Sequence, residues 1–285
     1  MWTRPAASRG CSEMSANLLS PAETVSAYAE AGAKKCALPP LRAFLLAILA
    51  GSLIAFAGAA TNTAAHTAQA AGTVRLICGL LFPFGLGIVV LMGTELFTGN
   101  CLIAISVLEK KAALSAMVKN WIIVYLGNFV GSLLVAAICV FSGQLNYSDG
   151  ALALFTMKLA AGKCALPFGA ALMMGIACNV LVCLGVLCAM TARDTTGKIL
   201  GAYIPVALFV LCGFEHSVAN MFYVPAGLLA GAVPSYAARA AESGLDLSLL
   251  TWGNFLVRNL LPVTLGNIIG GAGVGALLWR GHRAG

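Results

Sequence analysis

Six long, mainly apolar stretches constrain the fold more than any other feature of the 285-residue sequence. A helix needs about 20 apolar residues to cross a bilayer, and each stretch is at least that long. Two of the stretches are interrupted by polar residues, at 93–100 and 213–220. The sequence therefore predicts an all-α integral membrane protein whose six transmembrane helices cover 41–60, 76–108, 117–141, 165–190, 199–230 and 255–278.

The composition agrees with a membrane protein and excludes several other classes. Charged residues are 9% of the chain and the mean hydropathy is +0.92, whereas soluble domains have about 25% charged residues. The net charge of +7 comes from scattered basic residues, which do not form a nucleic-acid-binding face. The ten cysteines include no CxxC pair, so we expect small apolar side chains rather than disulfides or a metal site, and no cofactor.

Basic side chains predict the orientation, because cytoplasmic loops of membrane proteins are enriched in lysine and arginine. Twelve of the 17 basic residues lie in the tails and in the loops after spans two and four, and five lie on the other side. Both termini are therefore expected in the cytoplasm. We divide the chain into a cytoplasmic N-terminal segment 1–40, a transmembrane pore domain 41–278 and a cytoplasmic tail 279–285. We do not expect residues 1–14 to form a signal peptide, because they are polar and no apolar core follows closely, and Met14 is an alternative start.

The N-terminal segment contains a clear helix start. Ser20 is placed to cap the helix, Pro21 suits its first turn, and Glu23 completes a capping box. The following residues up to Lys35 are mildly amphipathic, which predicts a helix at the membrane surface.

The two halves of the chain repeat each other in three places. The letters KCALP occur at 35–39 and 163–167, both interruptions fit G-x-E-x-x-x-[GA]-N, and spans three and six share V-[KR]-N followed by G-N-x-x-G. The halves, 35–141 and 163–278, each contain three spans. Because three is odd, the second half enters the membrane from the opposite side, and the repeat is inverted. Such repeats place a substrate site near the midplane, between the broken helices.

The interruptions at spans two and five predict a polar centre. Backbone groups freed by a helix break must line a protein cavity, and the positive end of the following half-helix favours an anion. Glu95 and Glu215 are the acidic residues deep in the membrane, one in each break, with Asn100 and Asn220 closing each motif. We interpret these four as structural, with each carboxylate capping the backbone of its own break; a functional role is the alternative.

His216 is the histidine expected at mid-membrane, and Leu96 holds the matching place in the first half. Its ring could be a neutral group satisfied by a neighbour such as Thr98, or a donor and proton partner for an anion. Lys163 and Lys35 lie at opposite mouths, where they could concentrate anions or anchor the helices at the interface.

These motifs resemble the formate–nitrite transporter family. The resemblance is carried by 96–100, by 213–221 with the histidine, and by 266–271, and it extends over about 20–278. It implies an aquaporin-like fold without paired Asn-Pro-Ala motifs, a homopentamer with one pore per protomer, and small monoanions as substrates. It also implies that the protein is located in the cytoplasmic membrane.

The resemblance assigns roles to single positions. His216 matches the central pore histidine, Thr98 its hydrogen-bonding partner, Asn179 a polar residue beside the pore, and Lys163 the outer vestibule lysine. The matching apolar positions are an outer constriction of Phe82, Val182 and Phe209 and an inner slit of Leu86, Leu96 and Phe97.

Gly99 and Asn100 after Thr98 fit neither formate-type nor nitrite-type members, so formate, nitrite and hydrosulfide stay open, with formate favoured. A bare anion crosses apolar rings at high cost, so we expect proton-linked passage. An enzyme is not expected, because no catalytic pair accompanies His216. A channel for neutral solutes is the alternative from another class.

Overall fold

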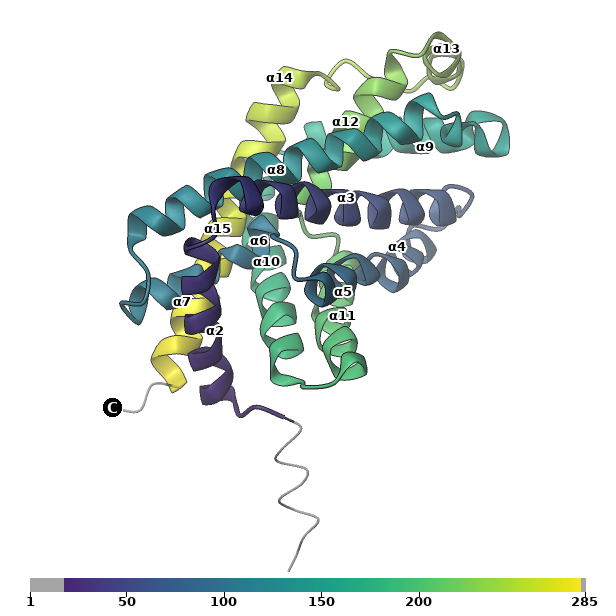
Figure 1. Ribbon diagram of the computed structural model, residues 1–285. Coiled ribbons are helices and arrows are strands. Elements are labelled where there is room, and N and C mark those ends of the chain that lie inside the picture. Colours follow the sequence, from purple (N-terminus) through teal and green to yellow (C-terminus); the bar gives the residue numbers. More distant parts are fainter. Residues whose placement is uncertain (1–17, 283–285) are drawn as a thin grey trace, which may run out of the picture.

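The computed structural model describes residues 18–282, and within this range the chain is helical without any strand. Leu18 forms an isolated bridge with Ala192. Six helical segments are long and apolar enough to cross a membrane (Figure 1). They are α3 (Pro40–Ala65), α4 with α5 (Ala71–Leu81 and Pro83–Met92), α8 (Leu114–Phe141), α10 (Phe168–Thr191), α11 (Thr195–Cys212) and the run Trp252–His282, formed by α14 (Trp252–Asn254), η2 (Phe255–Leu260) and α15 (Leu261–His282).

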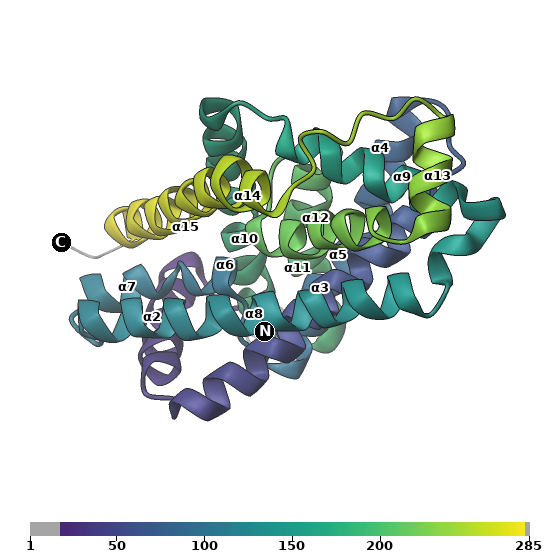
Figure 2. The same cartoon turned by 90° about the horizontal axis from the view of Figure 1, so that it is seen from above.

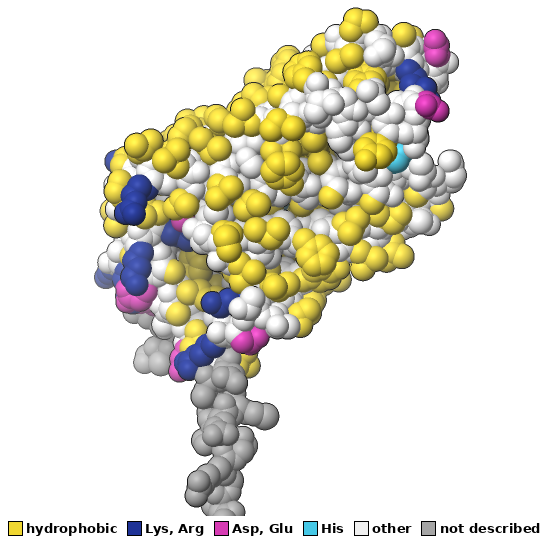
Figure 3. Space-filling model, turned by 45° about the vertical axis from the view of Figure 1, so that its right-hand side comes forward, with side chains coloured by type: hydrophobic (Ala, Val, Ile, Leu, Met, Phe, Trp, Pro, Cys, Tyr) yellow, Lys and Arg dark blue, Asp and Glu magenta, His cyan; other side chains and the backbone are white. Residues whose placement is uncertain are grey.

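The predicted spans are confirmed to within a few residues for most ends, and the predicted interruptions are also present. The expectations for Met14, for residues 1–14 and for the last residues of the tail lie outside the described residues. Figure 3 shows one broad apolar face of the molecule with charged side chains gathered toward its ends. Many leucine, isoleucine and phenylalanine side chains are exposed along the spans, as lipid-facing side chains must be in a multi-pass membrane protein.

Glycine brings the helices of each half into close contact. Helix α3 packs against α8, and α10 packs against α15. A side chain at Gly131 of α8 would collide with the carbonyl oxygen of Ile48, and one at Gly270 of α15 would collide with that of Ile176. The two glycines hold matching positions in the repeated G-N-x-x-G segments, so the repeat in the letters reflects a repeat in packing.

Both breaks begin at a glycine in the left-handed conformation. Helix α5 ends at Gly93 with φ 62°, and α11 ends at Gly213 with φ 73°. The chain becomes helical again at α6 (Phe97–Asn100) and at α12 (Ser217–Gly231). The halves differ here: α6 is a single turn followed by α7 (Ile103–Leu108), whereas α12 is continuous and joins α13 (Pro234–Glu242) through a 91° bend.

Helix α2 (Pro21–Cys36) has the predicted capping box: the Ser20 hydroxyl accepts from the Glu23 N–H at 3.3 Å, and the Glu23 carboxylate accepts from the Ser20 N–H at 2.8 Å. These bonds hold the pKa of Glu23 below its usual range. The buried face of α2 contacts α7, and Tyr28 Oη donates to the Gly99 carbonyl at 2.9 Å. The expected amphipathic helix thus packs onto the bundle; whether it also lies at the membrane surface stays a prediction.

Helix α9 (Tyr147–Cys164), preceded by the short turn η1 (Gln144–Asn146), was not predicted from the sequence. It ends at the second residue of the second KCALP segment, just as α2 ends at the second residue of the first. Each half therefore begins with a helix before its first span. In Figure 2, α9 runs beside α12, and the two helices are in contact.

Candidate functional site

One asparagine from a neighbouring span holds each break in place. Asn128 Oδ1 accepts from the Phe97 N–H at 2.9 Å, and its Nδ2 donates to the carbonyls of Ala47 and Glu95. Asn267 does the same in the other half: Oδ1 accepts from the Ser217 N–H at 2.9 Å, and Nδ2 donates to Gly175 and Glu215. These amides satisfy backbone groups that would otherwise be buried without partners.

The two glutamates form matched buried networks. Glu95 accepts from Lys35 Nζ at 2.7 Å and from Asn100 Nδ2 at 2.7 Å. Glu215 accepts from Lys163 Nζ at 2.8 and 3.0 Å and from Asn220 Nδ2 at 2.6 Å. Asn120 and Asn259 complete the networks by accepting from Asn100 and Asn220. Asn259 lies in the π-helical turn η2.

This arrangement corrects the predicted capping of the breaks by Glu95 and Glu215. The side-chain caps come from Asn128, Asn267 and His216 instead, because the carboxylates point to the lysine ammonium groups and the asparagine amides. It also means that Lys35 and Lys163 are not isolated cations. Each one is neutralised by a buried carboxylate, and Lys163 additionally lies over the ring of Tyr223.

His216 is buried between the two breaks and bonds to both. Its Nδ1 accepts from the Ala219 N–H at 3.0 Å, which caps α12, and its Nε2 lies 2.9 Å from Thr98 Oγ1. Because Nδ1 accepts, the neutral ring carries its proton on Nε2 and donates it to Thr98. The hydroxyl proton of Thr98 is then available for another acceptor. The structure thus brings together the histidine and the threonine that the sequence singled out.

Asn179 of α10 lies next to this pair but faces the backbone. Its Nδ2 donates to the carbonyls of Thr98 at 3.2 Å and of Asn267 at 2.6 Å, and the residue is fully buried. It links α10 to the first break and to α15. Its Oδ1 has no hydrogen-bond partner among the residues that the structure describes.

A cavity of about 480 Å³ reaches His216 from the side of the α3–α4 loop, and we call it the distal cavity. Its walls come from α4, α9, α11 and α12, and the second break lies at its deep end. Three cationic side chains and one acidic side chain line it, which leaves an excess of two positive charges. The charged lining residues are Arg75, Lys158, Lys163 and Glu215.

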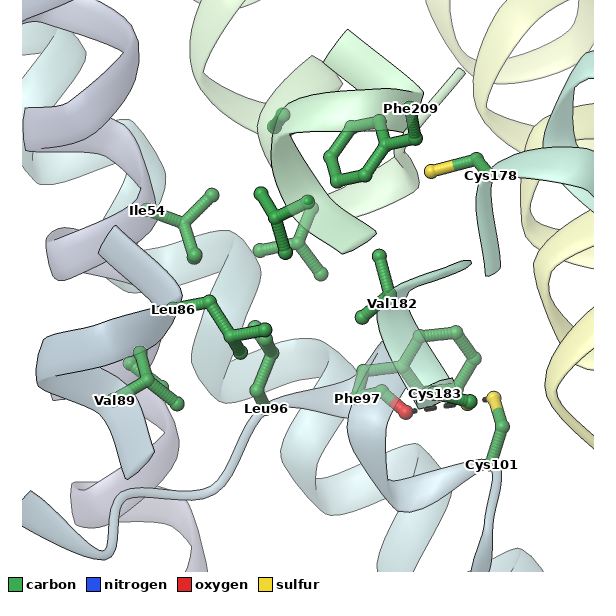
Figure 4. Close-up of a cluster of buried hydrophobic side chains, with 14 of the residues drawn as sticks. Ile54, Leu86, Val89, Leu96, Phe97, Cys101, Cys178, Val182, Cys183 and Phe209 are labelled. Atoms are coloured by element: carbon green, nitrogen blue, oxygen red, sulfur yellow. Dashed lines mark hydrogen bonds between the residues drawn. The ribbon is translucent and has the colours of Figure 1, made fainter. Parts of the chain in front are cut away.

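The predicted constriction residues are all buried in one apolar cluster around the polar pair. The rings of Phe82 and Phe209 meet edge to face at 6.0 Å, and the Phe209 ring stacks on His216 at 5.8 Å. Figure 4 shows Leu86 and Leu96 side by side, with Val182 across from them and Phe97 nearby. Only Phe82 and Phe209 of this set line the distal cavity.

Several residues of the site carry no predicted role. Asn120, Asn128, Asn259 and Asn267 lie in the repeated V-[KR]-N and G-N-x-x-G segments, so their repetition was the signal that could have marked them. Arg75 was counted only as a topology residue, because a single arginine near a predicted span end has no repeat partner to draw attention to it.

The fold and site define a six-span membrane pore protein with an inverted repeat and a histidine–threonine pair between two broken helices. A family model described as "Formate/nitrite transporter" matches residues 22–280. The chain therefore belongs to the formate/nitrite transporter family. This membership confirms the expectation of a transporter rather than an enzyme.

Individual relatives agree over most of their length. A "Probable formate transporter" of Methanothermobacter thermautotrophicus is 38% identical, with 93% of this chain and 98% of the relative aligned. The "Formate channel FocA" of Escherichia coli K12 is 37% identical, with 90% of this chain and 91% of the relative aligned. A solved "Pentameric formate channel with formate bound" has a TM-score of 0.75 and 37% identity, covering 85% of this chain and 96% of that one.

Proposed function

We propose that this chain passes small monovalent anions, formate first, through a pore in each protomer of a homopentamer. The relatives described above are named as formate transporters or channels, and one of them is a pentamer with formate bound. The observation in this chain that carries the proposal is the His216 ring, which lines a cavity with excess positive charge and hydrogen-bonds to Thr98.

The pair offers an anion one directed donor. With its proton on Nε2, His216 donates to Thr98 Oγ1, so the Thr98 hydroxyl donates toward the pathway. Phe82 and Phe209 on one side and Leu86 and Leu96 on the other make the flanks apolar. A bare charge crosses such flanks at high cost, while a neutral acid does not. Passage is therefore proton-linked, with formate or nitrite taking up a proton near the pair.

The matched lysine–glutamate networks have a structural role in this proposal. They keep the two polar breaks rigid while adding no net charge beside the pathway. We place the protein in the cytoplasmic membrane with both ends of the chain in the cytoplasm, because the basic residues predict that orientation. Nitrite and hydrosulfide are the alternative substrates within the same pore.

The test is uptake into proteoliposomes that contain the purified protein. Labelled formate competes with unlabelled nitrite and hydrosulfide, and osmotic shrinkage measures water and glycerol in the same vesicles. Formate uptake that glycerol does not compete with supports the proposal. Preference for nitrite or hydrosulfide changes the substrate, while water or glycerol flux without anion flux refutes the anion pore.

A further inference from the structure

Arg75 is an exposed cation in the wall of the distal cavity, and it has no hydrogen-bond or ion-pair partner among the described residues. It lies in α4 (Ala71–Leu81) and lines the distal cavity. Within residues 18–282 its guanidinium makes no hydrogen bond or ion pair. Lys163 in the same cavity differs, since Glu215 holds it with two contacts. Among the described cations of this cavity, Arg75 and Lys158 are therefore available to meet an anion, whereas Lys163 is already paired.

The guanidinium lies directly against the second break. A methyl group built on Gly213 would stand 2.7 Å from Arg75 Cζ and 2.8 Å from Nη1. Gly213 has φ 73°, so the left-handed turn and the missing side chain together make the space that the guanidinium occupies. The missing side chain at Gly213 thus leaves room for the guanidinium at the wall of the cavity. Gly213 lies three residues before His216 in the chain.

We propose that Arg75 is the receiving site for two-oxygen anions at the distal mouth, and that it selects carboxylates such as formate over hydrosulfide. The inference rests on the proposed anion pore and adds a specificity residue to it. A guanidinium presents parallel N–H donors that match the two oxygens of a carboxylate or nitrite. Hydrosulfide has a single sulfur and gains only from the charge. Arg75 therefore favours formate over hydrosulfide through its paired N–H donors, whereas Lys158 contributes a positive charge without such paired donors.

The chain provides a matched control for charge alone. Lys158 of α9 lines the same cavity, is exposed, and has no hydrogen bond or ion pair among residues 18–282. Arg75→Gln and Lys158→Gln each remove one positive charge from the cavity, and Arg75→Lys keeps the charge but removes the paired donors. Since Arg75 donates no hydrogen bond among residues 18–282, substituting it leaves no buried group without a partner. We therefore expect the Arg75 variants to fold normally.

The experiment measures KM for formate, nitrite and hydrosulfide in proteoliposomes with the wild type and these three variants. Size-exclusion elution confirms intact protein. We expect Arg75→Gln to raise the KM for formate about tenfold, and Lys158→Gln to raise it by about threefold. Arg75→Lys should raise the KM for formate and nitrite while leaving that for hydrosulfide close to the wild type.

Equal shifts in Arg75→Gln and Lys158→Gln, or no shift in Arg75→Gln, would overturn the proposal. Failure of the anion pore itself has a different signature, because the wild type would then move no anion. In that case line broadening of ¹³C-formate with the detergent-solubilised protein still decides the inference. If the wild type broadens the formate line and Arg75→Lys does not, the result supports the site. If the wild type and Arg75→Lys broaden it equally, the result contradicts the site.

Discussion

Nδ1 of His216 accepts a hydrogen bond from the backbone N–H of Ala219 at 3.0 Å. This bond makes the histidine both the cap of α12 and a residue of the pathway. It also determines which ring nitrogen faces Thr98 and which carries the proton in the neutral form. A proton added to Nδ1 would oppose the Ala219 N–H, so the helix end and the state of the ring are linked.

Thr98→Val should abolish most formate flux, because valine has the same shape but neither accepts from Nε2 nor donates to an anion. Thr98→Ser keeps the hydroxyl and should retain most of the flux. The measurement is initial uptake in proteoliposomes at saturating formate. Equal flux in the valine and serine variants would show that the hydroxyl has no part in transport.

Asn267→Ala and Asn128→Ala should each lower the thermal stability of the detergent-solubilised protein. Both substitutions leave one buried N–H and two carbonyls without their partners. An unsatisfied buried group costs about 1–3 kcal/mol, so the expected loss is large. Asn254→Ala is the control, because Asn254 makes its bonds at an exposed turn. A similar melting temperature for all three variants would contradict the assigned role.

Glu215→Gln should destabilise the protein more than Glu95→Gln. Both leave a lysine without its carboxylate, but the side chain of Lys163 is 13% exposed and that of Lys35 is 25% exposed. Breaking a buried pair costs about 3 kcal/mol or more. Thermal unfolding of the two single variants and of Lys163→Met/Glu215→Leu provides the measurement. The double variant should be more stable than Glu215→Gln alone; if it is less stable, the pair is not the source of the loss.

Gly213→Ala and Gly93→Ala separate backbone strain from the contact with Arg75. Both glycines have positive φ, so each alanine pays about 1–2 kcal/mol. Only the alanine at Gly213 would also displace the guanidinium, whereas nothing lies within 4 Å of a side chain at Gly93. We expect similar losses of stability but a raised KM for formate in Gly213→Ala alone. A raised KM in both variants would trace the effect to strain.

The sequence predicted the six spans and the two breaks, because apolar length and the internal repeat depend only on the order of residues. The meeting of His216 with Thr98 was implied by the resemblance to the family. It missed α9, since Asp149, Lys158 and Lys163 shorten the apolar run there. The caps were assigned to Glu95 and Glu215 because spacing within one segment cannot show that Lys35 and Lys163 reach across from another helix. The sequence likewise could not show that Arg75 has no ion-pair partner among the described residues, because ion pairing depends on three-dimensional packing.

The most direct measurement is the pH dependence of formate flux in the wild type and in His216→Asn, with His216→Phe as a second variant. Asparagine can still accept from the Ala219 N–H and cap α12, but it has no ring nitrogen that could exchange a proton with the anion. The account predicts that the wild type transports formate faster at acid pH and that both variants lose this dependence while eluting as intact protein. An unchanged pH dependence in both variants would contradict a proton-linked role of His216.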